Sequence, residues 1–441
     1  MKCYWLTTGV ATALLLVSSQ FVSSADAAPA EQDALGQSVS TKLMIPNESE
    51  PLVPKDLFGT KGGYFHPFIS ATALSSDNIY NSSSKISDWL TIYSPGIWLA
   101  APALQEIFLN LNTNNTSPGG HLQELDKAKS FSRYQSYALY VADISDYHNH
   151  SDLDNVKQSA EGFFQINLRG GLSIDLFDKF TSSQDPMGTI ANSTLLDKFK
   201  SNLLGVIADY DLTNKFRLRA DYTNFNLKYD LVDNQGRDRT DNSIATYLYY
   251  KYSDKTSLFF QYEFIDLAYK TNDAQDNKQH YTYVGMDWRP TGKTTLKGKV
   301  GAAVRDSSRD AGDDTEPALE LTADYKMTGK TTAQLFMAQK IDESTVSTSD
   351  YSIDKTINFA LTSYFTEKIG ARLQFGYQRS NFEGGDVDRN DDIYSASLIG
   401  SYTVKKWLKA EAGYQYSDRN SSLDIYDYSS NQIFVRLTTG I

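Results

Sequence analysis

The feature that most constrains the fold of this chain is a period-two alternation of apolar and polar residues, which dominates from residue 63 onward. Residues 371–378 read Ala-Arg-Leu-Gln-Phe-Gly-Tyr-Gln, and residues 408–415 read Leu-Lys-Ala-Glu-Ala-Gly-Tyr-Gln. Successive side chains of a β-strand point to opposite faces of the sheet. Such segments therefore predict strands with one apolar and one polar face.

Short turns and longer polar loops alternate along this series, and successive short turns are about 40 residues apart, which indicates a repeated unit. The short turns are 170–171, 211–214, 253–255, 290–293, 328–330, 366–368 and 404–406. A β-propeller blade has a similar period but holds four short strands, whereas each unit here holds two strands of about 12 to 15 residues. Alternation of tight turns with long loops is typical of outer-membrane barrels, whose tight turns face the periplasm.

The predicted fold is all-β: a transmembrane antiparallel outer-membrane β-barrel of about 18 strands, over residues 63–441. The strands are predicted at 64–80, 89–103, 132–147, 155–169, 171–181, 197–210, 215–230, 242–252, 256–270, 279–289, 293–305, 316–327, 330–341, 353–365, 369–380, 392–403, 407–418 and 428–441. Residues 104–131 are read as a periplasmic or luminal excursion. If they pair into the wall instead, the count becomes sixteen or twenty.

The aromatic content favours a membrane wall over a soluble aromatic-rich sandwich. Tyr, Phe and Trp number 29, 22 and 5, and rings such as Trp288 and Trp407 stand where strands meet turns. Girdles of amphipathic rings at both interfaces are typical of a bilayer-embedded barrel. Only one apolar run, at the N-terminus, approaches the roughly 20 residues of a membrane helix. The net charge of −12 argues against a nucleic-acid partner.

The N-terminus has the pattern of an export signal. Lys2 precedes the apolar run 10–17, and small residues lead to Ala27, so residues 1–27 are expected to be a cleaved signal peptide. The alternative is a single membrane anchor. Residues 28–62 are polar and without hydrophobic periodicity, and predict a flexible periplasmic leader. Because the only cysteine, Cys3, lies within the signal, the mature chain has no disulfide or thiolate site.

The polar parity of the strands is expected to face the lumen. The inferred inward bases are Arg169, Arg217, Arg219, Lys251, Lys297, Lys299, Arg305, Arg372, Lys409 and Arg436. The inferred inward acids are Glu161, Asp175, Asp209, Asp221, Glu263, Asp287, Glu320, Asp324 and Glu411. Such charges can guide a hydrated polymer or pair with one another. The clustered pairs Arg217/Arg219 and Lys297/Lys299 are the best candidates for contact with a polyanion.

Outer loops supply two further candidates. Residues 306–316 and 383–392 each hold five acids and one base, and could bind divalent cations beside lipopolysaccharide or form solvated loops. A possible rim site combines Asp146, His148, His150 and Asp152, because an Asp/His pair could activate water and His-x-His could bind a metal. No third ligand or nucleophile accompanies them, so no enzyme, metal or cofactor is predicted.

The first predicted hairpin resembles the putative beta-barrel porin 2 family. The aromatic-rich stretch 63–73 is followed by Asp77-Asn78, then Ser87-Asp88 and Ser94-Pro95-Gly96, and residues 112–120 with their Ser-Pro-Gly-Gly are also similar to members of this group. The resemblance implies an outer-membrane barrel that takes part in exopolysaccharide or capsule export, with a periplasmic export protein as partner. It supplies no catalytic residues.

Two details of this hairpin have structural interpretations of their own. The Asp-Asn and Ser-Asp pairs are expected to end strands at the first outer loop, where their side chains accept local backbone hydrogen bonds. The Pro95-Gly96 pair is expected to mark a bulge or kink within the second strand.

The predicted function is therefore passage of a polysaccharide through a water-filled lumen. Translocation needs hydrogen-bonding and charged groups on the inner wall and no covalent chemistry. The alternatives are a general diffusion porin for small solutes, a rim-active hydrolase, and a structural barrel whose acidic loops carry the function.

Overall fold

A computed structural model of the chain describes residues 64–101, 115–120, 133–189, 196–307, 314–344, 349–385 and 388–440. The predicted signal peptide (1–27) and leader (28–62) lie outside the described residues, as does most of the segment 104–131. Among the described residues, no helix is long and apolar enough to cross a membrane.

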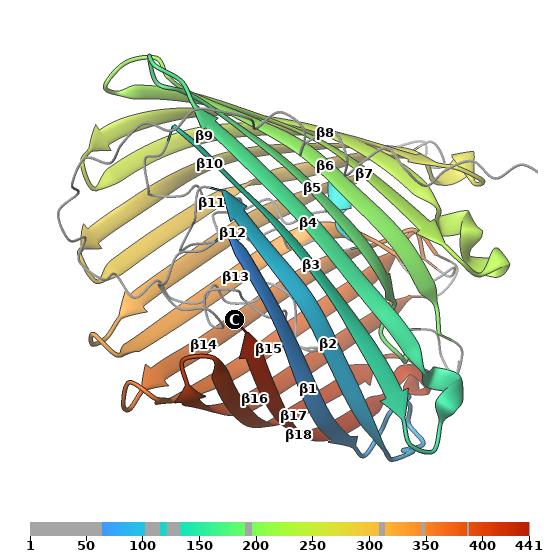
Figure 1. Ribbon diagram of the computed structural model, residues 1–441. Helices are drawn as coiled ribbons and strands as arrows, with labels where there is room; N and C mark the ends of the chain where they lie inside the picture. The colour runs from blue at the N-terminus through green and yellow to red at the C-terminus, as the bar shows by residue number, and fades with distance from the viewer. Residues whose placement is uncertain are drawn as a thin grey trace, which may run out of the picture. The chain divides into compact units, whose positions relative to one another are not determined.

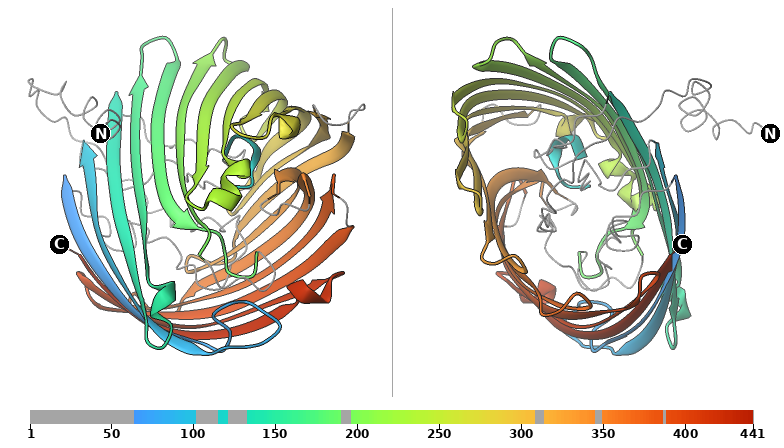
Figure 2. Two further views of the ribbon diagram at one scale, coloured as in Figure 1. Left: turned by 90° about the vertical axis from the view of Figure 1, so that its right-hand side faces the viewer. Right: turned by 60° about the vertical axis from the view of Figure 1, so that its left-hand side comes forward.

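Eighteen antiparallel strands form one sheet that closes on itself, because β1 pairs with both β2 and β18 (Figures 1 and 2). The strands are β1 Phe65–Ser76, β2 Asp88–Ala101, β3 Tyr134–Tyr147, β4 Asn155–Asn167, β5 Leu172–Gln184, β6 Lys198–Asp211, β7 Phe216–Tyr229, β8 Arg239–Ser253, β9 Thr256–Tyr269, β10 Asn277–Thr291, β11 Thr294–Ser307, β12 Asp314–Lys326, β13 Thr331–Glu343, β14 Tyr351–Tyr364, β15 Ile369–Glu383, β16 Arg389–Lys405, β17 Leu408–Ser421 and β18 Tyr428–Gly440. The prediction of an eighteen-stranded barrel is confirmed.

The two ends of the barrel differ in the length of their connections. Seven connections at one end, such as 254–255 and 168–171, have two to four residues, whereas those at the other end have five to thirteen. Short turns face the periplasm in barrels of this kind, so the long-loop end is the outer end. The connection from β2 to β3, residues 102–133, is the exception, because it leaves from the short-turn end but is long.

The faces of the strands follow the predicted parity. On β9, Leu258 and Phe260 are exposed on the outer surface, while Phe259 and Gln261 are buried on the opposite face. On β18, Ile433 and Val435 are likewise exposed. An outward apolar band over successive strands matches the hydrocarbon core of a bilayer, where side chains gain by contact with lipid rather than water.

Four outer loops share one structural motif that the sequence analysis did not predict. Each contains a short 3₁₀ helix and then an Asp, which accepts the backbone N–H of the residue that ends the preceding strand. The pairs are Tyr147 with Asp154, Tyr229 with Asp238, Tyr269 with Asp276, and Ser421 with Asp427, each at 2.7 Å. The helices are η2 Ser151–Leu153, η3 Val232–Arg237, η4 Asp273–Gln275 and η5 Asp424–Tyr426. Because short Asp side chains satisfy backbone donors locally, they fix where these strands end.

The seam between the first and last strands is fastened at its outer end by the Asp-Asn pair. Asp77 accepts the backbone N–H of Asn431 at 2.7 Å and its side-chain N–H at 2.8 Å. Fully buried Asn78 donates to the backbone oxygens of Ser82 and Ser429. The Asp77 contact is therefore made across the closure as well as at a strand end.

At the Pro95-Gly96 pair the structure keeps one register and has no bulge. Tyr93 lies opposite Ile144 and Gly96 opposite Val141, so the strands pair in the same register on both sides of the interruption. Pro95 has no N–H to donate to a ladder. Gly96 leaves room for the ring of Phe68 on β1, since a Cβ there would lie 2.2 Å from the ring.

Candidate functional site

The charged residues of the inner wall are largely joined in ion pairs. Lys299 lies 3.4 Å from Glu320, and Arg219 lies 2.7 Å from Asp221. At the β17–β18 side of the wall, Glu411 is shared: its carboxylate lies 2.9 Å from Lys409 and 3.6 Å from Arg436. The wall therefore presents hydrogen-bonding groups with little net charge, because most fixed charges have a partner.

The other predicted inner-wall residues are placed as follows. Glu263 is buried and accepts hydrogen bonds from Ser243 Oγ at 3.1 Å and Gln261 Nε2 at 3.3 Å. Lys297 lies opposite Asp287 in the ladder between β10 and β11 and is half-buried. Arg372 on β15 is also half-buried. These side chains are distributed around the wall rather than gathered at one point.

Tyrosine rings underlie several of the cations on β7 to β11. The Arg217 guanidinium lies 4.1 Å from the ring centre of Tyr249, and that of Arg219 lies 5.1 Å from Tyr247. Lys299 Nζ lies 4.7 Å from the ring centre of Tyr283. The rings hold the cations by cation–π attraction. Tyr249 lies near the short-turn end of the barrel, and Tyr283 lies farther from that end. The contacts between cations and tyrosine rings therefore extend from the short-turn end into the lumen.

The rim candidates are not brought together by the structure. His150 Nδ1 lies 2.8 Å from Asp88, whose carboxylate also accepts the backbone N–H of Asn149. Asp146, His148 and Asp152 are exposed. No group of three or more metal-ligating side chains occurs within the described ranges. The local arrangement thus anchors the β3–β4 loop to the start of β2.

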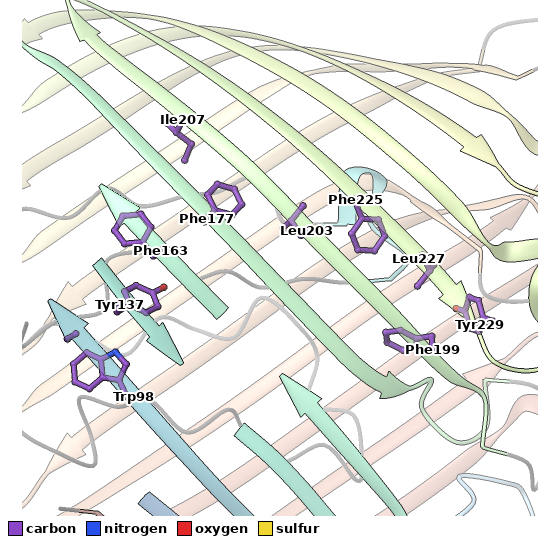
Figure 3. Close-up of a cluster of buried hydrophobic side chains, with 11 residues drawn as sticks. Trp98, Tyr137, Phe163, Phe177, Phe199, Leu203, Ile207, Phe225, Leu227 and Tyr229 are labelled. Carbon is purple, nitrogen blue, oxygen red and sulfur yellow. The ribbon is translucent and has the colours of Figure 1, made fainter. Parts of the chain in front are cut away.

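The inner wall carries an apolar cluster on β2 to β7, which the sequence analysis did not expect. Figure 3 shows this cluster on β2 to β7, and every member is buried although it lies on the inner face. It comprises Trp98, Ala100, Tyr137, Phe163, Phe177, Phe199, Leu203, Ile207, Phe225, Leu227 and Tyr229. Apolar side chains are stabilised by removal from water. This cluster is therefore a packing surface within a wall that also carries polar and charged side chains.

Residues 115–120 lie inside the ring of strands, where Figure 2 shows the short helix η1 (Pro118–Gly120). Ser117 receives hydrogen bonds from two bases: Lys340 Nζ donates to its Oγ at 2.7 Å, and Arg239 donates to its carbonyl oxygen at 3.3 Å. Gly119 donates its backbone N–H to Asp241 at 3.1 Å. All these partners lie near the outer ends of their strands, so the β2–β3 connection reaches far along the lumen.

Asn115 joins the same segment to the β5–β6 and β7–β8 loops. Its side-chain N–H groups contact Asp185 and the Tyr229 hydroxyl, and Arg237 lies 3.2 Å from Asp185. Burial raises the pKa of Asp185 to about 6, Arg237 opposes this rise, and Asp197 adds to it. A carboxyl that titrates near pH 6 thus forms part of the attachment of residues 115–120.

The outer end of β13 also contacts residues 115–120. The β12–β13 ladder stops at Leu319 and Gln339, whereas the β13–β14 ladder continues to Glu343 and Tyr351. Buried Glu343 accepts hydrogen bonds from the Tyr269 hydroxyl at 2.6 Å and from Gln279 at 2.8 Å. The hairpin end therefore separates from β12 and packs against side chains of the inner wall. We term residues 115–120 with Arg239, Asp241, Lys340 and Glu343 the luminal hub.

Sequence reasoning missed the hub, although one signal in the sequence points to part of it. A base followed two positions later by an acid recurs on the inner face, and each such pair forms an ion pair. The pairs are Arg219/Asp221, Arg239/Asp241, Lys340/Asp342, Arg389/Asp391 and Lys409/Glu411. Residues two apart in a strand share a face, so this spacing predicts pairing. Contacts between the hub and the distant strands have no such local signature.

Comparison with known proteins agrees with this architecture. A model of the family described as Putative beta-barrel porin 2 matches residues 56–440. None of the curated proteins with which the chain was compared matches it.

Solved structures that resemble the chain are outer-membrane proteins of low sequence identity. OpdK from Pseudomonas aeruginosa is 8% identical, with a TM-score of 0.43, over 86% of this chain and 99% of that one. OccAB3 from Acinetobacter baumannii is 10% identical, with a TM-score of 0.43, over 86% and 98%. Since the family model covers nearly the whole described barrel, the chain belongs to the Putative beta-barrel porin 2 family of porin-like outer-membrane β-barrels.

Proposed function

We propose that this protein is a channel through which a polysaccharide crosses the outer membrane. The observation that carries the proposal is the inner wall of β7 to β11, where ion-paired side chains lie over tyrosine rings from the mouth inward. A hydroxyl-rich polymer can exchange hydrogen bonds along such a surface without being trapped by an unpaired charge. The family and the fold indicate a channel rather than an enzyme.

The setting of the channel is part of the same proposal. The chain would be exported in a Gram-negative cell by a signal peptide cleaved after Ala27 and inserted among lipopolysaccharide. A periplasmic polysaccharide-export protein would dock at the short-turn end. The resemblance of the first hairpin to the family supports this setting, because members of the family are often linked to exopolysaccharide or capsule export.

A second candidate, a diffusion porin for small solutes, is favoured by the luminal hub. Residues 115–120 are attached to the inner wall near its outer end, through Arg239 and Asp241 on β8 and Lys340 on β13. A lumen that holds a fixed segment would admit small molecules more easily than a chain of sugars. Polymer passage therefore requires the hub to be displaced.

Single-channel recording in a planar bilayer separates the two candidates. Protein purified from outer membranes is inserted, and neutral dextran oligomers are added from either side. Polysaccharide passage predicts transient current blocks whose duration grows with oligomer length. A steady open current that ignores dextran but is altered by small solutes would instead establish the diffusion porin.

A further inference from the structure

A basic hollow of about 140 Å³ lies on the inner wall at the short-turn end, across β7 to β10. Its charged residues are four bases and two acids: Arg217, Lys251, Lys255, Arg289, Asp254 and Asp287. Tyr249, Thr256 and Ser257 complete the lining. A cavity of about 15 Å³ holds a single water, so the hollow has room for a larger polar group. We term it the mouth pocket.

The bases of the mouth pocket are less completely paired than those deeper in the wall. Among the described residues, neither Lys255 nor Arg289 has a carboxylate within ion-pair distance. Lys251 Nζ lies 3.1 Å from Asp211, whereas Arg217 lies 3.8 Å from Asp209 and its buried Nε makes no hydrogen bond. By contrast, Arg219 and Lys299 farther along the wall each have a close carboxylate partner. Two cations without a carboxylate partner among the described residues, Lys255 and Arg289, are thus located together at the mouth.

The Arg217 guanidinium is also positioned by contact with an aromatic ring. It lies 4.1 Å from the ring centre of Tyr249, which is itself buried. An arginine positioned on a ring face is preorganised, and its planar group of donors matches the two oxygens of a carboxylate. Lys255 lies in the short turn before β9 and Arg289 lies on β10, and the Arg289 backbone N–H bonds the Lys255 carbonyl oxygen at 2.8 Å. The three cations therefore converge from neighbouring elements.

We propose that the mouth pocket binds a carboxylate group of an acidic polysaccharide that enters from the periplasm. The inference rests on the proposed passage function and adds to it a substrate class, uronate-containing polymers, and a direction of entry. In a chain whose net charge is −12, cations without a carboxylate partner at the entrance attract an anionic polymer there. The paired charges deeper in the wall let the polymer move on, because they offer no second site of equal strength.

The test is side-specific block of single channels by oligogalacturonate. Neutral dextran of matched length and monomeric galacturonate are the comparison probes. The orientation of each channel in the bilayer is determined with an Ala274→Cys variant, which is labelled from one side. Ala274 lies in the outer η4 loop and is exposed there. Oligogalacturonate from the short-turn side is expected to block at about tenfold lower concentration than dextran, or than oligogalacturonate from the loop side. Monomeric galacturonate should need a higher concentration, and block by the monomer at equal concentration would overturn the polymer assignment.

Two variants with a matched control locate the site. Arg217→Gln and Arg289→Gln should each remove most of the preference for oligogalacturonate, since each takes one cation from the pocket. Lys293→Gln, in the next short turn and outside the lining, should leave it unchanged. Because Arg289 is exposed, its variant is expected to fold even if Arg217→Gln does not.

The outcomes separate this inference from the proposed function. If dextran and oligogalacturonate block equally and neither variant matters, the pocket assignment is overturned while polysaccharide passage stands. If neither polymer blocks an open channel, the passage proposal fails. Calorimetric titration of trigalacturonate into the detergent-solubilised protein then tests the pocket. Heat of binding to the unmodified chain that disappears in both variants supports the pocket assignment. Absence of binding to the unmodified chain overturns it.

Discussion

The backbone N–H of Glu343 donates to the carbonyl oxygen of Thr116 at 2.6 Å, which joins the outer end of β13 to the connection between β2 and β3. The same Glu343 carboxylate lies 4.0 Å from Arg305 and accepts the Tyr269 hydroxyl. The outer end of β13 is thereby linked both to residues 115–120 and to side chains of β9 and β11. The hub thus occupies part of the lumen near its outer end.

Removal of one attachment should release the luminal segment. Lys340→Ala deletes the hydrogen bond to Ser117, and a bond to a charged group contributes about 1.5 kcal/mol or more. Because about 1.4 kcal/mol is a factor of ten in an equilibrium, the population with the segment displaced should rise about tenfold. Single-channel recordings should show longer and larger openings. Lys355→Ala, at an exposed position on β14, should conduct as the unmodified chain does.

The buried pair Arg389/Asp391 gives a test of stability. Arg389→Met leaves the Asp391 carboxylate buried without its cation and should lower the free energy of unfolding by about 3–5 kcal/mol. Urea titration in lipid vesicles, followed by the heat-modifiable migration of the barrel on gels, measures the change. Arg379→Met, in an exposed pair 3.9 Å from Asp392, should change stability by less than about 1 kcal/mol. Equal effects of the two substitutions would contradict the account.

Closure of the barrel should depend on Asp77. Asp77→Ala removes the acceptor of the Asn431 backbone and side-chain N–H groups, leaving a donor near the seam without a partner. The expected loss is about 1–3 kcal/mol, with faster amide exchange at the outer end of β18. Asp146→Ala, at an exposed position on β3, should have almost no effect. Loss of function by Asp146→Ala without loss of stability would instead revive the rim-site hypothesis.

Attachment of the β5–β6 loop should weaken as pH rises. The pKa of Asp185 is raised from 3.8 to about 6, so the folded loop holds a proton that the unfolded chain would release. The stabilisation is complete below about pH 3.8 and is lost as pH rises through about 6. Each pKa unit is worth about 1.4 kcal/mol, so the total is on the order of 3 kcal/mol.

Hydrogen exchange over residues 184–189, corrected for intrinsic rates, measures this dependence. The opening free energy should fall between pH 4 and pH 6.5, and Asp185→Asn should flatten the profile because the amide does not titrate. An opening free energy that rises over this range in the unmodified chain would refute the assignment. Arg237, Asp197, Tyr229 and Asn115 are the groups that face Asp185, and only Asp197 among them is a second carboxyl.

The sequence predicted the wall of the barrel far better than its interior. Alternation in stretches such as 371–378 fixes which side chains face lipid, because a strand's period of two is a local property. The ion pair between Arg219 and Asp221 could also have been predicted, since residues i and i+2 of a strand share a face. The contact of Thr116 with Glu343 could not have been predicted, because these residues are distant in the chain and meet only when the barrel has closed. The apolar inner face was hidden because Leu203 and Ile207 lie in a stretch that is apolar on both parities.

The most direct test of polysaccharide passage is release of a labelled polymer from vesicles. Vesicles that contain the purified protein are loaded with fluorescent dextran oligomers and with labelled sucrose. The account predicts that both leave the vesicles, and that Lys340→Ala speeds the release of dextran more than that of sucrose, because the hub obstructs the polymer more. Release of sucrose with complete retention of dextran, in both the unmodified chain and Lys340→Ala, would contradict polysaccharide passage.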